Sequence, residues 1–297
     1  MVINKVAILG VGLIGSSLAR ALRRRGVCEK ISGFGNDENQ LEKALTLGVI
    51  DKFTLDSAEA VEGADVVVLA TPLCAMDSLF SGIKDALKAD AVITDVGSSK
   101  VSVIRSARHY LSPEQLGNFV PGHPVAGTEK SGVEASFAEL FEDHLVILTP
   151  LPETQEEAKK CISQIWESVG ATVTSMEIQH HDEVLAATSH LPHMLAYALV
   201  DCLASMQERD EIFKYAAGGF TDFTRIASSN PQMWNDVCIS NRENLSKMLD
   251  QFSSRLEEIK SAIGDGDSDA LLQIFTRAKS SRDEFTEKRS SSINPGK

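Results

Sequence analysis

The sequence predicts an α/β protein: an N-terminal doubly wound, mostly parallel sheet, followed by an all-α C-terminal domain. Two observations predict this division. Up to about Glu177, short β-branched runs alternate with helical stretches, the pattern of parallel strands joined by helices. After Glu177 the strand signal ends, and long stretches without Gly or Pro carry apolar residues at helical spacing. At 297 residues the chain is long enough for about two such domains.

The first half contains five clear strand candidates, each a short apolar or β-branched run. They are Val6–Leu9, Val66–Leu69, Val92–Thr94, Leu145–Leu148 and Thr172–Thr174. We therefore predict an α/β domain of the dinucleotide-binding kind over residues 1–177 and a helical domain over residues 178–285. Residues 286–297 are rich in Ser and poor in apolar residues, so a disordered tail or linker is expected there.

One apolar seam runs along the second half, with spacings that alternate between four and three residues. Its members are Leu245, Leu249, Phe252, Leu256, Ile259 and Ile263. Such a seam is typical of a helix that packs inside its own domain, and equally of one that packs against a second subunit. The sequence leaves both readings open.

Charge and cysteine usage exclude several classes of protein. The 29 Lys and Arg against 42 Asp and Glu give a net charge of -13, which opposes binding to nucleic acid or to an anionic membrane. Five cysteines without a C-x-x-C pair suggest neither a disulfide framework nor a zinc site. The most apolar helical stretch, Met194–Met206, carries Asp201 and is shorter than the roughly 18 residues that a bilayer requires. We expect a cytoplasmic protein without a metal.

The glycine motif directly after the first strand predicts a dinucleotide site. Gly10, Gly12 and Gly15 form G-x-G-x-x-G between that strand and a helix that begins near Leu13. The first glycine permits the tight turn, the second lets the backbone approach a pyrophosphate, and the third lets the helix pack on the sheet. The helix N-terminus attracts the phosphate charge, so Leu13 and Ile14 are also expected at the cofactor. This context predicts a Rossmann-like domain.

The residue that usually selects the cofactor is missing from the second strand. An acidic side chain is expected at the strand's end to bind the adenosine 2′-hydroxyl, but this chain has Gly35 there. Asp37 could reach the hydroxyl instead, and no cation follows at once to neutralise a 2′-phosphate. We therefore expect NAD, with NADP possible; a preference for NADP would require a cation from elsewhere, first of all Arg24 or Arg25.

Polar segments follow the next strands, where a doubly wound sheet binds its ligands. Thr71 and Pro72 come directly after one strand, and Gly97 and Ser98 after the next. A glycine-rich loop over 121–132 then holds His123 between Gly and Pro. Because an imidazole exchanges protons near neutral pH, His123 is a candidate for acid/base chemistry.

Five segments in combination resemble the prephenate/arogenate (cyclohexadienyl) dehydrogenase family of tyrosine biosynthesis, over about residues 6–285. They are the glycine loop, Gly97-Ser98, Gly-His-Pro-Val-Ala-Gly-Thr-Glu at 122–129, Ser-His-Leu-Pro-His at 189–193, and the Gly-Gly-Phe-Thr-Asp-Phe-Thr-Arg-Ile-Ala run at 218–227. The last three are specific in combination. The resemblance implies an NAD(P)-dependent enzyme that dimerises through its helical domain, with the active site between the domains.

The resemblance also implies roles for single residues. His123 is the catalytic histidine and Ser98 is its hydroxyl partner. Arg225 and His193 hold the carboxylates of the substrate. Four further residues belong to segments that match the surroundings of the substrate pocket: Thr128, Glu129, Asp222 and Trp234.

The implied reaction is the oxidative decarboxylation of prephenate, of arogenate, or of both, with hydride transfer to NAD(P). It gives 4-hydroxyphenylpyruvate or tyrosine, and CO2. The alternatives are another two-domain reductase, such as a β-hydroxyacid dehydrogenase or an imine reductase, and a dinucleotide-sensing protein without turnover.

The histidines of the second half could also bind a metal or lie in solvent. His190 and His193 are three residues apart, but no nearby carboxylate or thiolate completes a metal site. Pro192 is expected to kink this helix and direct His193 toward the substrate. We expect His180 and His181, at the domain junction, to be solvated.

Overall fold

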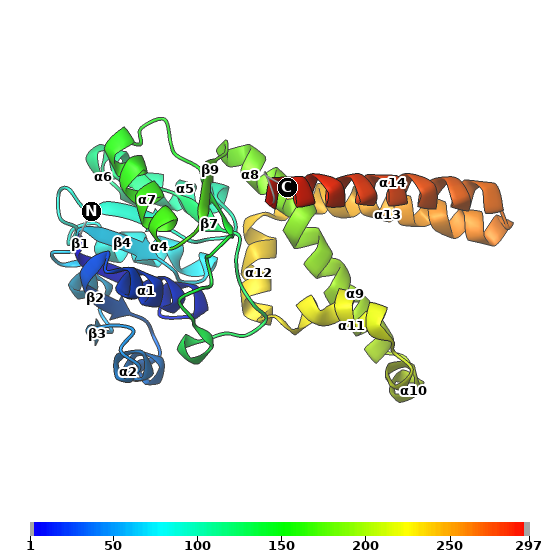
Figure 1. The fold of residues 1–297 in the computed structure, drawn as a ribbon, viewed down its shortest axis with the longest axis horizontal. Helices are drawn as coiled ribbons and strands as arrows, with labels where there is room; N and C mark the ends of the chain where they lie inside the picture. Colours follow the sequence, from blue (N-terminus) through cyan, green and yellow to red (C-terminus); the bar gives the residue numbers. More distant parts are fainter. Residues whose placement is uncertain (1–2, 294–297) are drawn as a thin grey trace. The chain divides into compact units, whose positions relative to one another are not determined.

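The computed structural model describes residues 3–293, and the first domain is built on a six-stranded parallel sheet (Figure 1). Its strand order is β3-β2-β1-β4-β5-β6. The strands are β1 (Ile3–Leu9), β2 (Cys28–Phe34), β3 (Lys52–Thr54), β4 (Val66–Leu69), β5 (Val92–Asp95) and β6 (Phe119–Val120). This is the order of dinucleotide-binding folds, whose ligands bind where the order reverses, next to β1. The predicted doubly wound sheet is confirmed.

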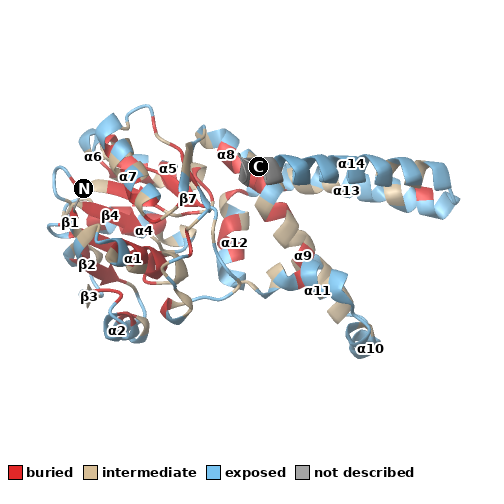
Figure 2. Ribbon diagram, in the orientation of Figure 1, coloured by how far each residue is buried: buried red, intermediate tan, exposed pale blue. Residues whose placement is uncertain are grey.

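Helices cover both faces of this sheet. They are α1 (Leu13–Arg25), α2 (Glu38–Thr46), α3 (Ser57–Val61), α4 (Met76–Ile83), α5 (Val101–Tyr110), α6 (Pro113–Gly117) and α7 (Glu156–Ser168). Strand β1 shows why two cores form: Val6 and Ile8 point into the core shared with α1, α2 and α7, whereas Ala7 and Leu9 point into the core shared with α3, α4 and α5. All four side chains are fully buried, as are most of the central strands (Figure 2).

A second, three-stranded sheet contains His123, the candidate for acid/base chemistry. It consists of β7 (Gly122–Pro124), β8 (Leu145–Leu148) and β9 (Thr172–Ser175), with β7 antiparallel and β9 parallel to β8. Two of the predicted strands, those near 145 and 172, therefore belong to a separate sheet. Pro121 alone separates β6 from β7, so the chain passes directly from the edge of the large sheet into the small one.

Every element that the structure describes after Ser175 is helical, as predicted. These elements are α8 (Ile178–Leu185), a π-helical turn (Ala186–His190), α9 (Leu191–Ala204), α10 (Arg209–Lys214), α11 (Gly218–Thr224), a short 3-10 turn (Arg225–Ser228), α12 (Pro231–Ser240), α13 (Arg242–Asp265) and α14 (Ser268–Ile293). None of the described helices has the length and apolar character needed to cross a membrane.

The compact units of the structure divide the chain at a different place from the change in secondary structure. One unit spans residues 1–245 and the other 246–297. Helices α8 to α12 belong to the first unit because polar side chains tie them to the sheet domain. Asp182 of α8 accepts hydrogen bonds from the Ser99 hydroxyl and from the backbone N–H groups of Lys100 and Val101.

The second unit contains most of α13 and all of α14, joined by a tight turn at Gly266 with φ of 66°. The prediction of a disordered tail from residue 286 is wrong for the described part, because α14 continues to Ile293. Ser does not stop a helix, and pairs four residues apart, such as Lys288 with Glu284, support this one. Residues 294–297 lie outside the described part of the chain.

The apolar seam of α13 is only partly covered within the chain. Leu245 is buried, but Leu256 and Ile263 are 52% and 63% exposed. Phe275 of α14 is also exposed, and both helices are largely exposed in Figure 2. Packing inside one chain therefore leaves much of the predicted seam in contact with solvent.

Candidate active site

The three glycines of the first loop have different neighbours. Gly10 has φ of +112°, and a Cβ there would lie 2.4 Å from the Ala70 carbonyl oxygen. A Cβ on Gly15 would lie 2.1 Å from the Gly10 carbonyl oxygen. A Cβ on Gly12 would meet no described atom within 4 Å. Gly10 and Gly15 are thus required by the fold itself, whereas Gly12 leaves open space before the N-terminus of α1, where Leu13 and Ile14 begin the helix.

The end of β2 has room for a larger side chain than the glycine it carries. A Cβ on Gly35 would make ordinary contact with Leu41, 3.6 Å away. Asp37 is the N-cap of α2, and its Oδ1 accepts hydrogen bonds from the backbone N–H groups of Asn39 and Gln40. That cap holds Asp37 beside its own helix.

The candidates after β4 and β5 also lie at this carboxyl edge of the sheet. The Thr71 hydroxyl is buried and has no hydrogen-bond partner in the described chain, and Pro72 begins a single 3-10 turn. Gly97 has tight surroundings, because a Cβ there would lie 2.7 Å from Leu73 and 2.9 Å from Asp95 Oδ2. The backbone N–H of Gly97 donates to that same carboxylate.

A buried ion pair holds the start of β7. Asp95 and Lys100 are both fully buried, and the Lys100 ammonium donates to Asp95 Oδ2. The ammonium also donates to the Gly122 carbonyl at 2.6 Å, and the Gly122 N–H donates to Asp95 Oδ1 at 3.2 Å. Both backbone groups of Gly122 are therefore fixed by buried charges, and His123 is the next residue.

His123 lies in a chain of hydrogen bonds that the sequence did not reveal. Its Nδ1 lies 2.9 Å from Nε2 of His181, and Nδ1 of His181 lies 2.8 Å from Oδ1 of Asp182. The prediction that His181 is solvated is wrong: its side chain is fully buried, because it faces β7 from α8. His180, its neighbour, has a side chain 62% exposed, as predicted.

Burial sets the protonation of this chain. It lowers the pKa of His123 well below the usual 6.5, and the nearby His181, Lys100 and His190 lower it further. Burial also lowers the pKa of His181, although the hydrogen bond to Asp182 opposes this. For Asp182, burial works to raise the pKa, but the hydrogen bonds that its carboxylate accepts outweigh burial and lower it. Two neutral imidazoles thus lie beside an ionised carboxylate at neutral pH.

Ser98 was implied as the hydroxyl partner of His123. It lies half-buried two residues before Lys100, and the hydrogen-bond partner that the structure gives the His123 ring is His181 instead. The reason is that Asp182 holds His181 against Nδ1 of His123.

A second group of rings lies around the π-helical turn that precedes α9. His193 stacks on Trp234 of α12, with ring centroids 3.6 Å apart, and its Nδ1 lies 2.9 Å from the Ser189 carbonyl oxygen. Pro192 cannot donate to the carbonyl four residues earlier, and the chain widens into the π turn just before it. A π turn thus directly precedes the position at which the kink was predicted.

His190, within this turn, is fully buried, and its Nδ1 lies 3.2 Å from the Asn241 amide nitrogen. Burial lowers the pKa of His190 to about 4. The ring is therefore neutral at physiological pH. In the described residues, Nε2 of His190 and Nε1 of Trp234 are buried without a hydrogen-bond partner.

The remaining substrate candidates lie nearer the surface. Arg225 has a side chain 63% exposed and pairs with Glu129 at 3.3 Å. The Thr128 hydroxyl accepts from the Lys130 N–H and Asp222 lies exposed on α11. Burial lowers the pKa of His193, and the charge of Arg225 lowers it further, so these two side chains influence each other.

The fold thus joins His123 from the first half of the sequence to His181, Asp182 and Asn241 from the second half in one hydrogen-bonded cluster. Asn241 connects its parts, because its amide donates to the Asp182 carbonyl and also lies beside His190. The members that the sequence analysis missed are Asp95, Lys100, His181, Asp182 and Asn241. Local sequence gave no signal for His181 and Asp182, because their contacts with the first half of the chain join positions 58 to 83 apart.

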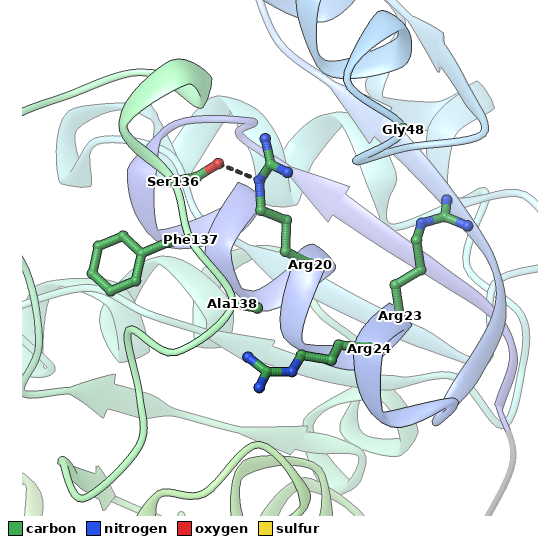
Figure 3. A pocket seen from close by; sticks show the side chains of 7 residues that line it. All are labelled: Arg20, Arg23, Arg24, Gly48, Ser136, Phe137 and Ala138. Atoms are coloured by element: carbon green, nitrogen blue, oxygen red, sulfur yellow. Dashed lines mark hydrogen bonds between the residues drawn. The ribbon is translucent and has the colours of Figure 1, made fainter.

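A hollow of about 550 Å³ lies elsewhere, lined by Arg20, Arg23 and Arg24 of α1 and by Ser136 and Phe137 (Figure 3). Arg23 pairs with Asp51 and Arg24 pairs with Glu139, so acidic partners neutralise much of the positive charge that lines this hollow.

Arg24 and Arg25 were the cations first considered for a 2′-phosphate. Both are paired with acids, Arg25 with Glu142, and both lie at the far end of α1, roughly 20 Å along the helix from Gly12. Each would have to leave its acidic partner before it could contact a 2′-phosphate.

Comparison with known proteins places this arrangement in a family. Residues 18–175 match the model of the prephenate dehydrogenase nucleotide-binding domain, and residues 177–277 match that of the prephenate dehydrogenase dimerization domain. The chain belongs to the prephenate dehydrogenase family. This membership decides against the β-hydroxyacid dehydrogenases and imine reductases that the sequence had left open.

Members of the prephenate dehydrogenase family match almost the whole chain. The cyclohexadienyl dehydrogenase of Zymomonas mobilis is 41% identical, over 95% of this chain and 96% of its own length. The prephenate dehydrogenase of Bacillus subtilis is 35% identical, over 94% of this chain and 76% of its own. The crystal structure of Aquifex aeolicus prephenate dehydrogenase with hydroxyphenyl propionate and NAD+ is 37% identical, has a TM-score of 0.88, and covers 96% of this chain and 99% of its own.

Proposed function

We propose that this protein catalyses the NAD-dependent oxidative decarboxylation of prephenate, of arogenate, or of both. The observation that carries the proposal is His123: a buried, neutral imidazole, held at the carboxyl edge of a dinucleotide-binding sheet by groups from both halves of the family's fold. Such a group is suited to accept a proton from a substrate hydroxyl. Family membership supplies the substrate class.

The residues present fit a bound NAD. The open space at Gly12 lies where a pyrophosphate would approach the N-terminus of α1, and the unpartnered Thr71 hydroxyl offers a polar contact at the same edge of the sheet. Gly97 and Pro72 would shape the adjoining wall. When bound, NAD accepts the hydride from the hydroxyl-bearing ring carbon of the substrate.

The chain's own residues then have three tasks. His123 accepts the hydroxyl proton as the ring carbon is oxidised, and His181 holds its ring in place. Arg225 and His193 hold the carboxylates, with Thr128, Glu129, Asp222 and Trp234 around them. Loss of CO2 makes the ring aromatic, so the protein has mainly to position the substrate and remove a proton.

The direct test is the rise in absorbance at 340 nm when purified protein, NAD and prephenate are mixed. We expect turnover, and steady-state kinetics with arogenate and NADP then rank the substrates and cofactors. A protein that binds NAD but gives no turnover with prephenate or arogenate is a dinucleotide sensor, which overturns the proposal.

We also propose that the active form is a homodimer through the helical domain, in the cytoplasm. The exposed apolar residues of α13 and α14, among them Leu256, Ile263 and Phe275, support a second copy as their partner. The five free cysteines support a reducing compartment.

Arg225→Ala is expected to raise KM for prephenate by roughly 10-fold to 100-fold, with a smaller effect on kcat. A charge-assisted hydrogen bond is worth about 1.5–3 kcal/mol, and the exposure of Arg225 places this one toward the lower end. Arg209→Ala is the matched control, because the Arg209 side chain is also 63% exposed but lies on α10. Equal KM values for both variants would make Arg225 a structural residue.

Gly35→Asp is expected to widen the preference for NAD over NADP. The site accepts the side chain, since a Cβ meets Leu41 at an ordinary 3.6 Å, and the new carboxylate repels a 2′-phosphate while it can accept from a 2′-hydroxyl. The measurement is kcat/KM for both cofactors. Thr46→Asp adds the same charge at the other end of α2, about 12 Å away, and serves as the control. A wild-type preference for NADP would contradict the assignment.

A further inference from the structure

The buried chain from Asp182 to His123 determines which nitrogen of each ring carries a proton. Asp182 is fixed by four hydrogen bonds: Oδ1 accepts from the Lys100 N–H at 2.7 Å and contacts His181, and Oδ2 accepts from the Ser99 hydroxyl and the Val101 N–H. Hydrogen bonds donated to both oxygens stabilise the ionised form of this carboxyl group and lower its pKa, and the ionised form has no proton to donate. Asp182 can therefore only accept from His181.

The orientation of the first hydrogen bond dictates the second. Because Asp182 accepts at Oδ1, Nδ1 of His181 must carry a proton, and since this buried ring is neutral, its Nε2 holds a lone pair. At 2.9 Å from that lone pair, Nδ1 of His123 must be the donor. A neutral His123 with its proton on Nδ1 has a free lone pair on Nε2.

We propose that Asp182 and His181 are positioning residues that hold His123 in the Nδ1–H tautomer, so that Nε2 is the atom that accepts the substrate's hydroxyl proton. This inference rests on the proposed function for its chemistry, but the tautomer itself is a property of the protein alone. The opposite tautomer would place a proton on Nε2 and leave His123 unable to act as a base there.

Lys100 and His190 lie near these hydrogen bonds, but neither reverses the direction in which His123 and His181 donate. The Lys100 ammonium lowers the pKa of His123 through its charge, but it already donates to Asp95 and to the Gly122 carbonyl, and an ammonium cannot accept a hydrogen bond. His190 lies near enough to affect the pKa of His123, but its Nδ1 faces Asn241. The ionised carboxylate of Asp182 thus determines which ring nitrogens of His181 and His123 carry protons. Asn241 holds the backbone of Asp182 in place.

The tautomer can be read directly by NMR on protein labelled with ¹⁵N at its seven histidines, since Nδ1–H and Nε2–H rings give different two-bond patterns. His123→Asn and His181→Gln assign the two signals. We expect His123 and His181 both in the Nδ1–H form at pH 7. A wild-type His123 in the Nε2–H form overturns the proposal.

Kinetics test whether the tautomer matters. His181→Leu removes the acceptor from Nδ1 of His123 and is expected to lower kcat by on the order of 100-fold, with KM unchanged because His181 holds no substrate. His181→Gln offers an amide oxygen as acceptor and should recover part of that loss. His180→Leu is the matched control, an adjacent but exposed histidine that should change neither constant.

The outcomes separate this inference from the proposed function. If His181→Leu keeps wild-type kcat, or if its loss lies in KM, His181 is not a positioning residue. If wild-type protein turns over neither prephenate nor arogenate, the proposed function fails, while the NMR spectrum still decides the tautomer. If His181→Leu does not fold, the wild-type spectrum and His181→Gln decide alone.

Discussion

Replacing His123 by Asn is expected to lower kcat for prephenate oxidation by roughly 100-fold to 10,000-fold while KM changes little, the signature of a lost general base. The structure explains why the loss should be large. His123 is almost fully buried, and its Nδ1 is already engaged by His181, so its function resides in the other nitrogen, which an amide cannot replace as a base. Asn retains a donor for the His181 contact, which limits damage to the fold.

The measurement is steady-state kinetics of NADH formation, with His144→Asn as the control because that histidine is exposed on the same domain. The pH profile adds a second readout. A base works in its neutral form, so activity falls as pH falls through its pKa, and because burial lowers the pKa of His123, kcat/KM should stay high below pH 6.5. Near-normal kcat in the variant would remove His123 from the mechanism.

Two alanine substitutions in the glycine loop should change different properties: Gly10→Ala should lower the stability, and Gly12→Ala should weaken NAD binding. Gly10→Ala is expected to lower the melting temperature by roughly 6–12 °C, because φ of +112° and a Cβ 2.4 Å from a backbone oxygen together cost about 3 kcal/mol or more. Gly12→Ala should leave the melting temperature unchanged, since its Cβ meets no described atom within 4 Å. It should instead weaken NAD binding on the order of 100-fold, because the methyl group lies where the pyrophosphate approaches.

Thermal unfolding without NAD and titration calorimetry with NAD measure the two effects separately. Each variant is the control for the other, as they differ by two positions in one loop. If Gly12→Ala binds NAD as tightly as wild type, the open space at Gly12 is not the pyrophosphate site, and the cofactor assignment at this loop fails.

Much of the fold could be predicted from the sequence because its signals are local. The β-branched runs that alternate with helices predicted the parallel sheet, and the glycine motif predicted the turn between β1 and α1. Where local signals were weak, the prediction failed. The Ser-rich end has little apolar content, yet α14 continues to Ile293, since helix continuation depends on neighbouring turns as much as on burial.

The sequence by itself determined the family, the dinucleotide loop and the identity of His123 as the candidate base, because each is carried by residues close together in the chain. Only the tertiary structure decided the surroundings of that base. His180 and His181 are adjacent and chemically identical, yet a rotation of about 100° per residue along α8 leaves one exposed and buries the other against His123. Asp182 is bound by residues about 80 positions earlier, a pairing that packing alone creates.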